Sequence, residues 1–106
     1  MQSDRIRAIG IDATGRLYVE PEHQQFPFIH RECMQVTWHP EQGVLQAPAP
    51  RDWSQLDWYR QILAAAERQG CTLTLSPQTE WHNVPDYIRR TIEATPQAPA
   101  SQSVVT

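Results

Sequence analysis

Residues 53–75 read WSQLDWYRQILAAAERQGCTLTL, and this stretch predicts a long helix followed at once by a buried strand. From Ser54 to Gln69 the apolar residues recur at spacings of three and four, which places them on one face of a helix. Gly70 stands where the helix should end, because glycine readily adopts the left-handed conformation that closes many helices. Residues 71–75 then form the predicted strand. The apolar face of the helix consists of Trp58, Tyr59, Ile62, Leu63 and Ala66.

The start of this helix carries two capping signals. Ser54 can accept hydrogen bonds from the free backbone N–H groups of the first turn, and Asp57, three residues on, completes a capping box. Trp53 precedes the cap and Trp58 follows it at the spacing of a hydrophobic staple. These signals predict that the helix begins at Ser54.

A hairpin is predicted at the N-terminal end. Residues 5–12 are rich in isoleucine and predict a strand, and residues 16–20 alternate between apolar and polar side chains. Between them, Asp12 and Gly15 are residues typical of a tight turn, so we expect a hairpin with a glycine bulge. The polar face of the second strand consists of Arg16, Tyr18 and Glu20.

A second hairpin is predicted before the main helix. Residues 26–39 hold one long strand or two shorter ones, and the alternation is clearest in residues 34–38. Residues 40–43 predict a turn and residues 44–47 a short strand.

The C-terminal part predicts a loop, a short helix and a tail. Residues 80–83 predict a loop with Trp81 tucked into the core. A helix is expected from Pro85 to Ala94, because proline is favoured in the first helical turn. Residues 96–106 are mostly Pro, Ala, Ser and Gln, which predicts a disordered tail.

The order of these elements predicts an α+β fold. We expect an antiparallel sheet of about five strands, made of two N-terminal hairpins plus one strand, packed by one main helix and a short C-terminal helix. Residues 1–95 are predicted to form a single domain, since cores of this size are the commonest. The predicted core consists of Leu17, Val19, Val36, Trp38, Ile62, Leu63, Leu73, Leu75 and Ile88.

Composition and charge narrow the functional classes. The chain has 106 residues, a formal net charge of −3 and two cysteines. Because the charge is acidic, we expect neither nucleic acid nor a membrane surface as a partner. The sequence shows no secretory signal and no apolar run long enough to cross a bilayer, so a cytoplasmic location with reduced thiols is expected.

Residues that could bind a metal or act as nucleophiles are few. His30, Cys33 and His39 lie closest in sequence, but in an extended strand they would be too far apart or on opposite faces to share an ion. Cys71 follows the C-terminal end of a helix, where the helix dipole disfavours a thiolate. The sequence therefore predicts no metal, no cofactor and no catalytic cysteine.

An enzyme that works by acid–base catalysis is another alternative. Glu80 and His82, with Asp12 from the first turn, are the groups from which a small hydrolase or isomerase would be built if they converged in a cleft. The favoured interpretation of residues 80–83 is an ordinary loop, with Trp81 in the core and Asn83 assisting the start of the next helix. The sequence therefore does not predict an enzyme.

Four tryptophans in so short a chain are unusual and indicate either an extended core or an interface. Trp and Arg are enriched where proteins bind one another. If the domain acts by binding, the expected contact residues lie around the start of the main helix. They are Arg51, Trp53 and Tyr59.

The chain resembles small bacterial toxin-immunity proteins and proteins of mobile gene cassettes. The motifs that carry this resemblance are IGID at 9–12, GRLYV at 15–19, PRDWS at 50–54, and Trp81 followed by Val84-Pro85. The resemblance implies a non-catalytic protein that binds a cognate toxin and blocks it, or another protein partner. A basic toxin would suit an acidic chain.

Two other hypotheses stay open. The domain could be a small ligand- or accessory-binding module of a mobile gene cassette, which would need a concave apolar pocket. A homodimer is also compatible with the sequence.

Overall fold

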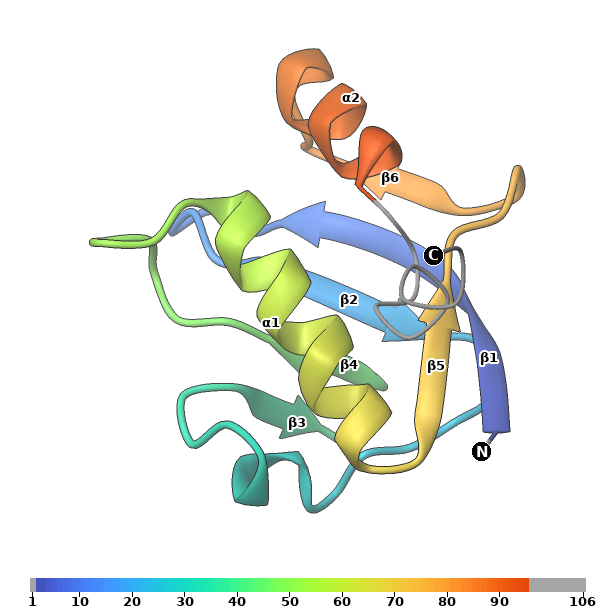
Figure 1. Ribbon diagram of the computed structural model, residues 1–106. Helices are drawn as coiled ribbons and strands as arrows, with labels where there is room; N and C mark the ends of the chain where they lie inside the picture. Colours follow the sequence, from blue (N-terminus) through green and yellow to red (C-terminus); the bar gives the residue numbers. More distant parts are fainter. Residues whose placement is uncertain (1, 96–106) are drawn as a thin grey trace, which may run out of the picture.

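Six strands and two helices make up the fold in the computed structural model, which describes residues 2–95 (Figure 1). The strands are β1 (Gln2–Ile11), β2 (Leu17–Pro21), β3 (Thr37–His39), β4 (Val44–Gln46), β5 (Cys71–Thr74) and β6 (Glu80–His82). The helices are α1 (Gln55–Arg68) and α2 (Asp86–Ala94), and a short 3-10 helix, η1, covers Ile29–Arg31.

The strands form a single sheet in the order β3-β4-β2-β1-β5, with β6 also paired to β1. The predicted α+β class and both hairpin pairings are confirmed, since β1–β2 and β3–β4 are antiparallel. The sheet differs from the prediction in two respects: β5 and β6 run parallel to β1, and β6 is an additional strand. A helix that crosses a sheet returns the chain in its original direction, which is why the strand after α1 is parallel.

β5 and β6 share the edge of β1 that lies opposite β2. β5 pairs with the first half of β1 and β6 with the second half, so the chain leaves this edge and returns to it. Thr79 fills the interruption. Its buried hydroxyl donates to the carbonyl of Ile6 at 2.6 Å and accepts from the backbone N–H of Ser76 at 3.0 Å. One side chain thus supplies the hydrogen bond that a continuous strand would have made.

A β-bulge at Arg7 changes which residues of β1 face the core. The register with β2 shifts between Ile6 and Ala8. Ile6 faces the core before the bulge, and Ile9 and Ile11 face the core after it. Since strand side chains alternate between faces, an isoleucine spacing of three followed by two requires such an extra residue.

α1 lies across one face of the sheet and forms the core with it (Figure 1). Ser54 and Asp57 form the predicted capping box, and Gly70 has the positive φ of +91° expected just after the helix. The rings of Trp53 and Trp58 lie 4.7 Å apart between centroids, in agreement with the predicted staple. Seven predicted core residues are buried: Leu17, Val19, Val36, Ile62, Leu63, Leu73 and Ile88. Trp38 and Leu75 are half-buried and pack against this core.

The strand predicted in residues 26–36 is wrong. This segment contains η1 and turns, and β3 begins only at Thr37. Phe26, Ile29 and Val36 are buried, whereas Met34 is 88% exposed. Their spacings of three and seven do not fit the alternation of a strand, and the segment instead turns through η1, which places all three side chains in the core.

The residues after β5 also differ from the prediction. Residues 80–82 form β6 instead of a loop, and α2 begins at Asp86 with Pro85 as its cap. Trp81 is half-buried against the core, and the guanidinium carbon of Arg89 lies 5.0 Å from its ring centroid. The tail predicted at residues 96–106 lies outside the described residues. In the described part of the chain, neither helix combines the length and the apolar character needed to span a membrane.

Candidate functional site

The residues predicted to contact a partner do not all lie at the surface. Tyr59 is 0% exposed and belongs to the core, so its predicted role as a contact residue is corrected. Arg51 is exposed and Trp53 is 43% exposed. These two residues line one hollow of about 480 Å³, which we call the tryptophan face. Its lining residues are Gln35, Pro48, Ala49, Arg51, Asp52, Trp53 and Trp58.

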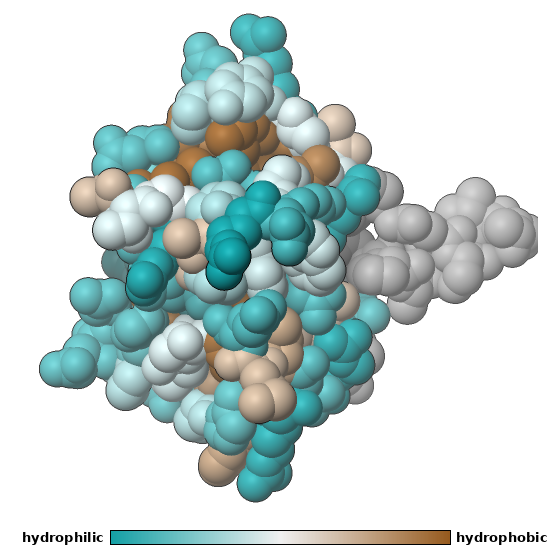
Figure 2. Space-filling view, turned by 90° about the vertical axis from the view of Figure 1, so that its left-hand side faces the viewer, coloured by the Kyte–Doolittle hydropathy of each residue, from teal (hydrophilic) through white to brown (hydrophobic). Residues whose placement is uncertain are grey.

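Local sequence explains how the tryptophan face is built. The prolines at 48 and 50 restrict the backbone of the connection from β4, and Ser54 fixes the start of α1 directly after it. Trp53 therefore rests on the buried ring of Trp58 while its other side remains in solvent. The connection projects at the left of Figure 1. The space-filling view of that side shows apolar residues gathered at the level of α2 and polar residues over most of the remaining surface (Figure 2).

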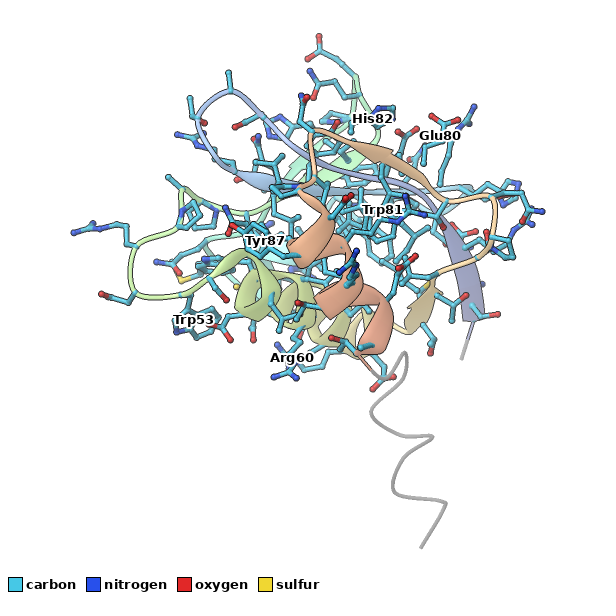
Figure 3. The ribbon with its side chains drawn as sticks, turned by 90° about the horizontal axis from the view of Figure 1, so that it is seen from above. Trp53, Arg60, Glu80, Trp81, His82 and Tyr87 are labelled. Atoms are coloured by element: carbon cyan, nitrogen blue, oxygen red, sulfur yellow. The ribbon has the colours of Figure 1, made fainter. Side chains whose placement is uncertain are left out.

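Glu80 and His82 lie on β6, on the side of the sheet away from α1 and Trp53 (Figure 3). Both are exposed, and the Nε2 atom of His82 lies 3.2 Å from Oε1 of Glu80. An exposed pair of this kind is solvated and contributes little energy. Trp81, between them in the chain, points to the opposite side toward α2.

Asp12, the third predicted acid–base residue, is engaged by the hairpin turn. One carboxylate oxygen accepts from the backbone N–H groups of Thr14 and Arg16 and from the Thr14 hydroxyl, at 2.7 to 3.0 Å. The other accepts from the Gln46 side-chain amide at 2.7 Å. Burial acts to raise the pKa of Asp12, but the hydrogen bonds outweigh it and the pKa lies below its usual value. Asp12 is therefore a charged acceptor that holds other groups, which does not suit a general base.

A second hollow lies on the uncovered face of the sheet, and sequence reasoning missed it. It has a volume of about 500 Å³ and we call it the sheet basin. Its lining residues are Asp12, Tyr18, Glu20, His39, Gln42, Val44 and Gln46. The predicted polar face of β2 was a signal for it, but strand register brings in β3 and β4: Tyr18 pairs with Gln46, and His39 with Val44.

A chain of hydrogen bonds crosses the sheet basin. The Gln46 amide nitrogen donates to Asp12, so its amide oxygen faces His39 and accepts from the Nε2–H of His39 at 2.8 Å. This arrangement assigns the proton of a neutral His39 to Nε2 and leaves Nδ1 as an acceptor. The basin is therefore preorganised, because Gln46 is held at both ends.

Tyr18 forms one wall of the sheet basin. Its ring crosses over Gly10 so closely that a Cβ atom at Gly10 would overlap it. Burial, followed by the negative charges of Glu20 and Asp12, raises the pKa of the Tyr18 phenol. The phenol is protonated at neutral pH, as in any tyrosine, and the two carboxylates act on its pKa in the same direction as burial.

Another carboxylate missed from the sequence is Asp4, which is buried near the start of β1. It accepts from the backbone N–H groups of Arg5, His23 and Gln24 at 2.8 to 3.0 Å, and the His23 ring lies 3.2 Å away. Burial would raise the pKa of Asp4, but these hydrogen bonds lower it overall. Asp4 thus ties the chain after β2 to β1 and has a structural role.

The histidines and cysteines that were considered as metal ligands or nucleophiles do not come together in a site. Among the described residues, the structure brings together no group of three or more His, Cys, Asp or Glu side chains that could hold a metal ion. Cys33 is half-buried and Cys71 is buried, and both are free thiols. Burial, with a smaller contribution from the charge of Asp4, raises the pKa of Cys71 and disfavours its reactive thiolate.

Comparison with known proteins gives a family match, and the matched residues include all those that line the two hollows. The family model described as Integron Cassette Protein Hfx_Cass5 matches residues 4–79. A solved structure of an integron cassette protein Hfx_Cass5, from the mobile metagenome of North West Arm Sewage Outfall, is 46% identical to this chain. The match covers 87% of this chain and 93% of that chain, with a TM-score of 0.46. No curated protein matches. Glu80 and His82 lie just beyond the matched residues, whereas every lining residue of the tryptophan face and the sheet basin lies within them.

Proposed function

The chain belongs to the family of Integron Cassette Protein Hfx_Cass5, and we propose that, as a domain encoded by a mobile gene cassette, it acts by binding a protein partner. In this proposal the domain is non-catalytic and the tryptophan face is its contact surface. The predicted resemblance to mobile-gene-cassette proteins is confirmed. A role as an immunity protein against a cognate toxin remains part of the proposal.

The observation that supports this function is Trp53. Its ring is anchored on Trp58 on one side and 43% exposed on the other, beside the exposed guanidinium of Arg51. Binding energy at interfaces is concentrated in residues of these types when they sit in or beside a pocket. A rigid ring also loses little conformational freedom on binding, which favours affinity.

The charge of the chain indicates the kind of partner. A net charge of −3 would attract a basic protein and speed its association. A basic toxin fits this description. We propose the cytoplasm as the compartment, because the protein would meet such a toxin there.

The test is co-expression with the product of the neighbouring gene, followed by pull-down, growth rescue and titration calorimetry. We expect Trp53→Ala and Arg51→Ala each to weaken binding by about 2 kcal/mol, or roughly 30-fold. Tyr87→Ala and Arg60→Ala are the matched controls, because both side chains are exposed outside the tryptophan face (Figure 3). Absence of a stable complex and of rescue would contradict the immunity role.

The hydrolase or isomerase alternative has weaker support. It needs Asp12 to act with Glu80 and His82, but the oxygens of Asp12 are engaged by the turn and by Gln46. If His82→Ala abolished a measured turnover, this alternative would replace the binding function.

A further inference from the structure

The sheet basin is separate from the tryptophan face. α1 packs on one face of the sheet, and Glu80 and His82 mark the other side in Figure 3. The strand register places Glu20 of β2 and Glu80 of β6 on either side of Ala8, and Tyr18 and His82 on either side of Gly10. The ring of Tyr18 fills the space over Gly10, and the basin itself is lined by side chains of β2, β3 and β4 together with Asp12 and Gln42 from the turns.

Shape and charge together define what the basin could hold. A hollow of about 500 Å³ lies in the range of sites for small molecules. Its lining contains the carboxylates of Asp12 and Glu20, and none of its lining residues is Lys or Arg. Arg7 lies 3.8 Å from Glu20 but is largely in solvent, so it compensates the charge of Glu20 only weakly. His39 is the remaining ionisable group of the lining besides Tyr18.

Tyr18 and Val44 add an apolar surface to this charge. A ring beside carboxylates favours a cation, because the face of an aromatic ring attracts positive charge and the carboxylates complete its neutralisation. The amide oxygens of Gln42 and Gln46 are further acceptors for an N–H donor.

We propose that the sheet basin binds a small organic cation, a primary amine or guanidinium attached to a short aromatic or apolar body. Glu20 would pair with the charge, while the ring of Tyr18 would contact the apolar body. Asp12 would act by holding Gln46 and by adding to the negative potential. This inference does not depend on the proposed function.

The test uses benzylamine, with benzyl alcohol as a neutral probe of the same shape and benzoate as the anion, titrated into the full chain and followed by NMR. We expect saturable binding of benzylamine that shifts resonances of the basin, with benzyl alcohol at least about tenfold weaker and benzoate weaker still. Rising salt concentration should weaken the binding of benzylamine. Equal affinities for benzylamine and benzyl alcohol would overturn the proposal.

Variants locate the site. Glu20→Gln should weaken benzylamine binding at least about tenfold, and Glu20→Lys should reverse the preference toward benzoate. Glu67→Gln on α1 is the matched control, and Trp53→Ala should leave the affinity unchanged. Unfolding curves of each variant exclude a general loss of structure. If Glu20→Gln binds benzylamine as tightly as the original chain, the basin is not the site.

Discussion

Replacing Thr79 with valine tests how β5 and β6 are joined along the edge of β1. Valine has nearly the same shape but lacks the hydroxyl, so the carbonyl of Ile6 loses its partner at 2.6 Å and the N–H of Ser76 its acceptor at 3.0 Å. An unpaired buried polar group costs about 1–3 kcal/mol. Ser76 is only half-buried and can be partly solvated. We therefore expect Thr79→Val to reduce the free energy of unfolding by about 2–3 kcal/mol.

The free energies of unfolding are measured in urea, and two further variants serve as controls. Thr79→Ser keeps both hydrogen bonds and removes one methyl group, so its loss should stay near 0.8 kcal/mol or about one CH₂ equivalent. Thr91→Val removes an exposed hydroxyl bonded to the carbonyl of Tyr87, and should change stability by less than about 0.5 kcal/mol. A loss below about 1 kcal/mol for Thr79→Val, or equal losses for its Val and Ser variants, would refute the assigned role of the hydroxyl.

Three other predictions follow from buried groups. Leu63→Ala should lower the free energy of unfolding by about 2–5 kcal/mol in urea, and a loss under about 1 kcal/mol would place Leu63 at the surface. The pKa of Asp4 is lowered on folding, so its stabilisation is present at neutral pH and is lost as pH falls through that lowered pKa. Asp4→Asn should therefore be less stable than the original chain at pH 7, with a difference that narrows below about pH 4; a difference independent of pH would contradict this. Alkylation without reductant should label both cysteines in the denatured chain, and Cys33 before Cys71 in the folded chain. An unlabelled pair would indicate a disulfide.

Elements specified by neighbouring residues could be predicted from the sequence. The start of α1 depends on Ser54 and Asp57, and its end on Gly70, and all three lie in the helix or next to it. The first turn depends likewise on Asp12 and Gly15, which bond within the turn itself. Such signals operate over a few residues, so they survive without knowledge of the rest of the fold.

Elements specified by distant residues could not be predicted. β6 has only three residues, and its extended conformation depends on pairing with Ala8–Gly10, some seventy residues earlier in the chain. In residues 26–36, Phe26 and Ile29 are buried in the hydrophobic core, and their burial decides how the segment turns. No pattern of neighbouring residues indicates that burial. Tertiary contacts override local pattern in both cases.

The candidate sites divide in the same way. Arg51 and Trp53 could be expected to lie close together because both stand just before a helix start, whose position is a local property. Tyr59 stood in the predicted apolar face of α1, and that position already indicated its burial. The contact of Asp12 with Gln46, and of Gln46 with His39, arises only from strand register. The sheet basin therefore could not be predicted from the sequence pattern.

The position of β1 has a consequence for synthesis of the protein. Its hairpin partner β2 follows almost at once, but the strands for its other edge begin only at Cys71. At about 5–20 residues per second, a ribosome needs roughly 3–10 s between Pro21 and Cys71. During that interval the nascent hairpin has one unpaired edge with isoleucines nearby, a form that can pair with other chains. Rapid translation of the middle of the gene, or a chaperone bound to the nascent chain, would therefore raise the yield of folded protein.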